Sequence, residues 1–271
     1  MCTAVLSIEA GRPVLLAGIR DELTDRPWQP PASHWPDHPG LFGGRDLQAG
    51  GTWLAVAPSS RRVACVLNGT GKLAPTETRQ SRGELPLLTA AGGQLPDAEL
   101  ADFDPFRLVV AEPGHCEVLS WDGTALNAAD LTDGLHFVVN SGYASDLAGS
   151  AGRATAWTGP DWQGPPPPDG REHELARAGY FLDRFRSAKR PSPMPGVPVA
   201  DAWGEWFSLV NGDGLAPDDE RALIVRRELG GGRTWGTTSV SLVALTAEWV
   251  RYDFCAAPGD PAAWIQVPLA H

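Results

Sequence analysis

Residues 1–23 read MCTAVLSIEAGRPVLLAGIRDEL, and the rest of the predicted fold is arranged around them. Apolar runs at residues 5–8 and 14–19 have the length and composition of strands, and the residues between them, Ala10-Gly11-Arg12-Pro13, are typical of a turn. The pattern predicts a β-hairpin that places Cys2 beside Asp21. One end of a sheet would then hold a thiol and a carboxylate.

Further strands are predicted on both sides of a helical segment. The apolar runs that indicate them lie at residues 52–57, 63–67, 106–111, 117–121, 136–139, 223–226, 234–245, 248–254 and 264–267. Residues 171–187 carry an apolar stripe opposite charged residues, which predicts an amphipathic helix, and a second helix is predicted over residues 201–210. Strands before and after helices indicate an α+β fold.

The size and the proline-rich stretches bear on domain organisation. A chain of 271 residues with 42% apolar content can bury a full core, and we expect one domain over residues 1–271. The stretches at 159–170 and 191–198 are expected to be stiff connectors, because proline cannot join the interior of a sheet. Such connectors either link elements on the surface or border a substrate entrance.

Composition excludes several classes of function. The net charge of -11 leaves no basic stripe for phosphates, so neither a nucleic acid nor an anionic membrane surface is expected as a partner. The first eleven residues hold neither a signal peptide nor a spanning segment, which predicts a cytoplasmic protein without integral membrane contact. Its four cysteines are then expected to be reduced, and their irregular spacing fits no zinc site, so we predict no metal and no cofactor.

Cys2 is the residue on which the chemistry is predicted to depend. A small second residue permits removal of Met1, after which Cys2 owns a free α-amine with a reference pKa of about 8. That amine accepts the thiol proton, so nucleophile and base lie in one residue. Asp21 would hold the α-ammonium and Arg20 would stabilise the thiolate. The alternatives are a core-filling cysteine and an ordinary ion pair that closes a turn.

A series of motifs spread along the chain then gives a family resemblance. The segments are LAGIRDEL at 16–23 followed by Arg26-Pro27, Trp35, GGRDL at 43–47, GGTWLAV at 50–56, RGEL at 82–85 and WGT at 235–237. In this order they resemble the NRDE proteins, also called the transport and Golgi organisation family, with Ile19 where that family has asparagine.

The resemblance implies a fold and a site. The fold is the four-layer αββα sandwich of N-terminal nucleophile (Ntn) hydrolases, in which two stacked antiparallel sheets lie between helical layers, as in the bile-salt hydrolase and penicillin acylase group. Asn68 and Asn140 resemble the two asparagines that form the oxyanion hole of those enzymes, and Arg233 resembles a late arginine beside the nucleophile. Either asparagine, taken alone, is also typical of a turn.

This chain departs from those relatives at two arginine positions. The early arginine of the bile-salt hydrolases stands three residues before the aspartate, where this chain has Gly18, and its basic residue is Arg20. Successive strand residues face opposite sides, so Arg20 and Asp21 are not both expected to reach the site. Thr238 stands where the family carries a second arginine, which bears on recognition of an anionic substrate.

Two functions from different classes follow. The first is an amide hydrolase or acyltransferase that forms a Cys2 thioester with a small amide or acyl substrate. The eleven tryptophans include Trp53, which we predict to bind substrate, although core packing accounts for most of the others. The second is a non-catalytic carrier of haem, lipid or acyl-CoA on the same scaffold, as the resemblance also implies.

Overall fold

The predicted hairpin forms the centre of the larger sheet in the computed structural model. Strands β1 (Thr3–Ile8) and β2 (Val14–Leu23) pair antiparallel and are almost wholly buried. Their side chains alternate between two cores, which explains how ten consecutive residues of β2 can be largely apolar and still form a strand. The structure describes the chain apart from residues 1, 93–94, 96–99, 148–170 and 270–271.

The larger sheet has eight strands, in the order β11-β10-β1-β2-β13-β14-β15, with β12 also paired to β13. The strands that flank the hairpin in this sheet are β10 (Gly134–Val139), β11 (Gly142–Leu147), β12 (Arg226–Gly230), β13 (Arg233–Leu245), β14 (Val250–Cys255) and β15 (Trp264–Gln266). Every one of these pairings is antiparallel. The 13-residue strand β13 runs the length of β2 and carries the C-terminal part of the chain to the centre of the molecule.

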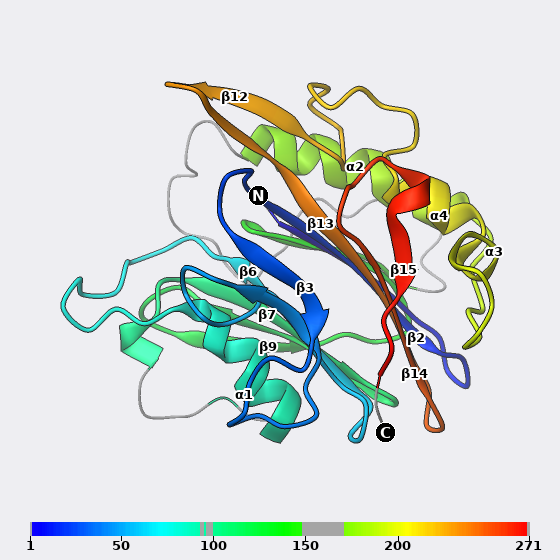
Figure 1. The fold of residues 1–271 in the computed structure, drawn as a ribbon, viewed down its shortest axis with the longest axis horizontal. Helices are drawn as coiled ribbons and strands as arrows, with labels where there is room; N and C mark the ends of the chain where they lie inside the picture. Colours follow the sequence, from blue (N-terminus) through cyan, green and yellow to red (C-terminus); the bar gives the residue numbers. More distant parts are fainter. Residues whose placement is uncertain (1, 93–94, 96–99, 148–170, 270–271) are drawn as a thin grey trace.

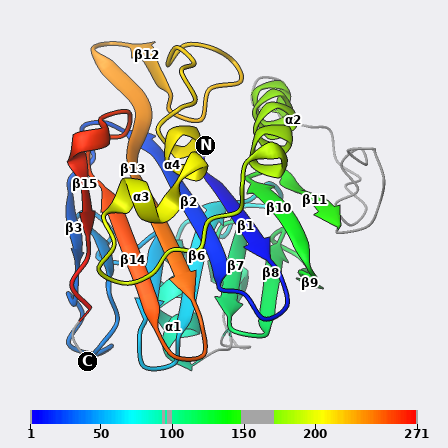
Figure 2. The same cartoon turned by 90° about the vertical axis from the view of Figure 1, so that its right-hand side faces the viewer.

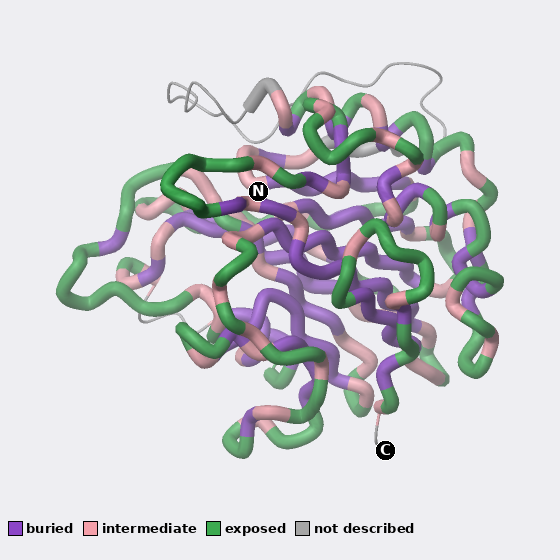
Figure 3. Tube along the Cα trace, turned by 45° about the horizontal axis from the view of Figure 1, so that its top comes forward, coloured by how far each residue is buried: buried purple, intermediate pink, exposed green. Residues whose placement is uncertain are grey.

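The smaller sheet has five strands in chain order, and a separate two-stranded ribbon lies beside it. Its strands are β5 (Leu54–Ala57), β6 (Arg62–Asn68), β7 (Phe106–Glu112), β8 (His115–Trp121) and β9 (Leu126–Asp130), and the ribbon consists of β3 (Trp28–Ala32) and β4 (Gly43–Asp46). The two sheets pack face to face through one apolar core to which both contribute (Figure 1). Buried residues are concentrated in these strands, and exposed residues lie in the loops (Figure 3).

Helices cover the outer faces of both sheets. The α-helices are α1 (Leu85–Gly92), α2 (Arg171–Ser187), α3 (Val199–Trp203) and α4 (Glu205–Val210), and short 3₁₀ turns occupy Arg82–Glu84, Leu100–Asp102 and Pro261–Ala263. Helices α2, α3 and α4 pack on the larger sheet (Figure 2), and α1 packs on the smaller one. The structure is therefore a mixed α and β fold with mostly antiparallel sheets and few helices. Among the described residues, no helix has the length and apolar character needed to cross a membrane.

Several predicted elements are confirmed and others need correction. The helix at 171–187 is found as predicted, whereas the helix over 201–210 is two short helices, because the backbone turns at Gly204, whose φ is 50°. No strand covers 223–225, where Val225 instead bonds to the Thr237 side chain, and β12 starts at Arg226. The 191–198 stretch is a connector without regular structure, and 159–170 lies outside the described residues.

Candidate functional site

A small cavity of about 220 Å³ lies where β2 and β6 end. It is lined by five of the residues predicted from the sequence, namely Cys2, Arg20, Asp21, Asn68 and Trp53. Asn68 is the last residue of β6 and is exposed, whereas Trp53 is 9% exposed and belongs to the core between the sheets. The hairpin and the start of the smaller sheet therefore bring these residues together across 66 positions of sequence.

Cys2 and Asn140 each lie one residue outside a paired strand. Thr3, the first residue of β1, pairs with Ile19 on β2 and with Val139 on β10, so Cys2 precedes these pairs and Asn140 follows them. Asn140 is in the turn between β10 and β11 and is not among the residues that line the cavity. Asn140 Oδ1 is buried and has no hydrogen-bond partner among the described residues. An unpaired buried acceptor of this kind is where a ligand or a water molecule is expected.

The surroundings of the Cys2 thiol favour its neutral form. Burial raises the pKa of the thiol, the charge of Asp21 adds to that rise, and the charge of Arg20 opposes it. The closest polar contact of Sγ is the backbone oxygen of Asp21, at 3.8 Å. Because the thiolate is the nucleophilic form of cysteine, this site needs a proton acceptor before Cys2 can attack a carbonyl.

Arg20 lies on the same side of the sheet as the thiol. Its guanidinium stacks over the Trp53 ring at 4.5 Å, donates to Thr238 Oγ1 at 2.8 Å and approaches Asp46 Oδ2 at 3.4 Å. The side chain is only 5% exposed, and burial lowers the pKa of its guanidinium. Thr238, where the family has an arginine, thus serves as a hydrogen-bond partner that holds Arg20.

The charges around Arg20 form a closed network. Asp46 accepts from Arg26 at 2.6 Å, and Glu22 lies 3.8 Å from both guanidinium groups. Burial raises the pKa of Asp46, but hydrogen bonds from Arg26 and from two backbone amides outweigh burial, so the pKa lies below its usual value. The network contains two cations and two anions, and its charges therefore balance.

Asp21 faces the other side of the sheet, toward the helices. Its carboxylate accepts from Arg177 of α2 at 3.1 Å and from the hydroxyl of Thr237 at 2.7 Å. Arg177 also donates to Thr3 Oγ1 at 3.0 Å, so one guanidinium ties β1 to β2 next to the nucleophile. The exposed fractions of the Arg177 and Asp21 side chains are 3% and 0%. Arg20 and Asp21 point to opposite sides of the sheet, and the side chain that shares the face of Cys2 is that of Arg20. Both residues nevertheless line the cavity, so the expectation that they would not both reach the site is not met.

The polar end of α2 was not identified from the sequence. Arg177 and Glu174 are buried on the face that continues the apolar stripe, and Glu174 accepts hydrogen bonds from the backbone amide and hydroxyl of Ser141, next to Asn140. The 3.6-residue period places both charged residues in register with Phe181, and this was the available signal. By contrast, Leu175, which the apolar stripe includes, is 36% exposed.

Arg233 is not part of the cavity. It is the first residue of β13, it is exposed, and it lies opposite Gly230 in the β12–β13 hairpin. The structure therefore does not place Arg233 among the residues that line the cavity with Cys2. β13 instead contributes Thr237 and Thr238, where a bulge lets one strand turn successive side chains to Asp21 and Arg20.

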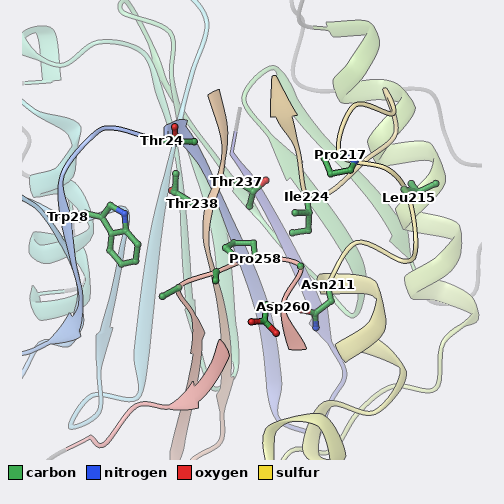
Figure 4. Close-up of a pocket in the computed structure, with 13 residues that line it drawn as sticks. Thr24, Trp28, Asn211, Leu215, Pro217, Ile224, Thr237, Thr238, Pro258 and Asp260 are labelled. Carbon is green, nitrogen blue, oxygen red and sulfur yellow. The ribbon is translucent and has the colours of Figure 1, made fainter. Parts of the chain in front are cut away.

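A second cavity, of about 660 Å³, lies beyond these threonines. Figure 4 shows Thr237 and Thr238 among its lining residues, together with Trp28 and Asp260. Trp28 meets Trp53 edge to face at 5.8 Å, so the tryptophan pair stands between this cavity and the one at Cys2. The larger cavity offers apolar and hydroxyl groups but no nucleophilic thiol.

One group of side chains has the composition of a metal site. The ligand atoms of His115, Glu117 and Asp130 lie within 4.8 Å of one another, on the outer strands of the smaller sheet, far in sequence from the hairpin. Two of the three residues are exposed, and His115 and Glu117 also form an ordinary surface ion pair at 3.9 Å. We assign no metal to this group.

Comparison with known families gives one match. The family model described as Transport and Golgi organisation 2 matches residues 1–155, which is more than half of the chain. That interval contains the hairpin, the smaller sheet, the cavity residues from Cys2 to Gly83 and also Asn140. No curated protein matches the chain.

Proposed function

This chain belongs to the Transport and Golgi organisation 2 family, and we propose that it is an N-terminal cysteine hydrolase or acyltransferase acting on a small linear amide. The observation that carries the proposal is that Cys2, Arg20 and Asn68 line one small polar cavity, while Asn140 follows the last pair of β10 with β1 and has a buried side-chain oxygen without a partner among the described residues. The order of layers supports a four-layer αββα sandwich of the Ntn-hydrolase type, since helices lie outside two face-packed sheets.

The proposed reaction begins with removal of Met1. The new α-amine of Cys2 takes the Sγ proton, and the sulfur attacks the amide carbon of the substrate. The resulting α-ammonium then gives that proton to the leaving nitrogen as the C–N bond breaks, which leaves a Cys2 thioester and a free amine. Water or a second amine attacks the thioester, the C–S bond breaks, and the thiol regains its proton.

Each remaining predicted residue has a place in this scheme. Asn140 and Asn68 donate side-chain amide hydrogen bonds to the oxyanion of the tetrahedral intermediate. Arg20 stabilises the thiolate from the same face of the sheet, and Trp53 forms the apolar wall of the substrate site. Asp21 acts as a positioning residue, because its carboxylate is bound by Arg177 and Thr237 on the helix side.

An acyl transfer assay tests the proposal. Protein whose N-terminus is confirmed as Cys2 is incubated with p-nitrophenyl acetate and then digested, and the Cys2 peptide is weighed. We expect one acetyl group on Cys2, and acetylation about 100-fold slower in protein that retains Met1, since a general base contributes about that factor. Absence of a Cys2 adduct in processed protein would overturn the proposal.

The oxyanion assignment has its own matched pair of variants. Asn140→Ala is expected to slow Cys2 acetylation by about 100-fold, which is typical for one oxyanion donor. Asn127→Ala removes the same group from an exposed position on β9 and is expected to leave the rate unchanged. Equal rates for the two variants would remove Asn140 from the mechanism.

Carriage of haem, lipid or acyl-CoA is the second function, and the 660 Å³ cavity favours it. That volume lies within the range of about 300–1,000 Å³ typical of small-molecule pockets, whereas the cavity at Cys2 lies below it. Titration of the Cys2→Ala variant with haem and with acyl-CoA separates the two functions. Tight, saturable binding by this variant, together with no acetylation of the processed wild-type protein, would support a carrier.

A further inference from the structure

Arg82 stands apart from the other charged residues of the cavity. The other two arginines that line the cavity, Arg20 and Arg26, are paired with Asp46 and Glu22 within 4.0 Å. Arg82 also lines the cavity, yet it forms no ion pair with any described residue, and its Nη1 donates to the backbone oxygen of Pro105 at 2.9 Å. Asp21 also lines the cavity, but its carboxylate is paired with Arg177, and the network of Arg20 and Arg26 is balanced, so Arg82 adds a positive charge at this cavity in a chain whose net charge is -11.

The backbone around Arg82 is built to hold it at the cavity. Arg82 opens a 3₁₀ turn that Ser81 caps by accepting from the Gly83 amide at 3.2 Å. Gly83 in turn accepts from the Thr52 amide at 2.9 Å, and a Cβ on Gly51 would lie 2.4 Å from the Gly83 carbonyl carbon. Two glycines thus permit a backbone contact that no side chain would allow. This contact joins the turn of Arg82 to the residues just before Trp53.

The bonding capacity of Arg82 points toward a ligand. A guanidinium carries five N–H donors in a planar fork that matches a carboxylate, and only one nitrogen of Arg82 is bound to the protein among the described residues. The unbound nitrogens are not buried orphans, so they are open to the cavity or to solvent. Burial nevertheless lowers the pKa of the Arg82 guanidinium. The charges of Asp104 and of the Cys2 sulfur oppose this change.

We propose that Arg82 is the anion anchor of the cavity, and that the substrate is a small amide bearing a carboxylate close to the scissile carbonyl. This inference rests on the proposed function of Cys2 as nucleophile. The charge balance excludes Arg20 and Arg26 from the same role, because each is already neutralised by protein carboxylates. The volume of about 220 Å³ restricts the substrate to a compact molecule.

Two alkylating reagents that differ in one group test the anchor. Iodoacetate and iodoacetamide both form a C–S bond with Cys2 as iodide leaves and the thiol proton passes to solvent, but only iodoacetate carries a carboxylate. In Arg82→Gln, alkylation of Cys2 by iodoacetate is expected to slow about tenfold relative to wild type, the effect of losing one charge-assisted bond. Alkylation by iodoacetamide is expected to change less than twofold. Peptide mass mapping gives both rates for Cys2 alone.

Two further variants isolate the charge of Arg82. Arg79→Gln makes the same change in net charge three residues away, at an arginine that pairs with Asp104 at 3.2 Å outside the cavity, and it is expected to leave the reagent preference unchanged. Arg82→Lys keeps the charge without the fork and is expected to retain most of the preference. Equal slowing by the two glutamine variants would overturn the anchor.

A direct binding measurement keeps the inference separate from the reactivity of Cys2. Titration calorimetry with succinate is expected to show binding to wild type and to Arg79→Gln, and about tenfold weaker binding to Arg82→Gln. Failure of succinate to bind wild type would overturn the anchor even where Cys2 is acetylated by p-nitrophenyl acetate. Selective succinate binding without Cys2 acetylation would instead retain the anchor and reject the nucleophile.

Discussion

At the end of β2, each face of the strand carries an ion pair between arginine and a carboxylate, but the two faces differ in how far these side chains are exposed to solvent. On the helix side, Asp21 and Arg177 form an ion pair whose exposed fractions are 0% and 3%. On the side between the sheets, Arg20 belongs to a network in which Asp46 and Arg26 are 13% and 24% exposed. A buried pair fixes the backbone beside the nucleophile, whereas a partly hydrated network can adjust its charges around a substrate. Of these two adjacent residues of β2, Asp21 therefore stabilises the structure, and Arg20 takes part in the chemistry of the cavity.

The largest expected effect comes from breaking the buried pair. Arg177→Met removes the guanidinium that binds the buried carboxylate of Asp21, and the free energy of unfolding is expected to fall by about 3–5 kcal/mol. Urea denaturation measures the loss. Arg184→Met, on the same helix, removes an arginine that is 53% exposed and lies 3.6 Å from Asp213, and it is expected to cost less than about 1 kcal/mol.

A double variant shows whether the cost comes from the orphaned charge. Asp21→Asn combined with Arg177→Met is expected to be less destabilising than the sum of the two single variants, because both charges are then removed together. If the losses in free energy of unfolding are additive, the two side chains contribute to stability independently, and their ion pair is not what stabilises the helix side of β2.

Arg20→Met is expected to lower the free energy of unfolding less than Arg177→Met does, and to change the reactivity of the Cys2 thiol more. Arg26 still binds Asp46 at 2.6 Å, so the free energy of unfolding is expected to fall by only about 1–3 kcal/mol. The pKa of Cys2 is expected to rise, because the charge of Arg20 lowers it. Iodoacetamide alkylation of Cys2 at pH 8 should slow by up to about tenfold, the change in thiolate fraction per pKa unit. Arg184→Met should leave that rate unchanged.

The smallest expected effect is a dependence of the free energy of unfolding on pH. It comes from Asp46, which lies on the side of β2 that faces the smaller sheet. The pKa of Asp46 is lower in the folded protein than its ordinary value of 3.8, so its contribution to stability is complete above that value and is lost as the pH falls below it. Between pH 5 and pH 3, wild type is expected to lose about 1 kcal/mol more stability than Asp46→Asn, the scale of a partly exposed pair. Parallel curves for the two proteins would contradict the role assigned to Asp46.

Sequence patterns predicted the parts of the site that depend on local order. The hairpin, the helix at 171–187 and the opposite orientation of Arg20 and Asp21 all follow from periods of two or 3.6 residues. Arg177 was missed, because a charged residue within an apolar stripe has no meaning until its partner across the fold is known. The resemblance suggested Arg233, but where β13 crosses β2 is set by the strand register, which brings Thr237 and Thr238 to Asp21 and Arg20 and leaves Arg233 outside the cavity lining.

The sequence by itself determined the hairpin, the family and the position of Cys2 at the end of a buried strand, because these depend on alternation and on short motifs. The tertiary structure alone decided which charges are paired. The ends of β2 and β6 put Arg20 and Asn68 at one cavity with Cys2, and the packing of α2 neutralised Asp21. Electrostatic interactions act across space between distant segments, so the absence of an ion pair at Arg82 among the described residues becomes visible only when the nearby carboxylates have been assigned to their partners.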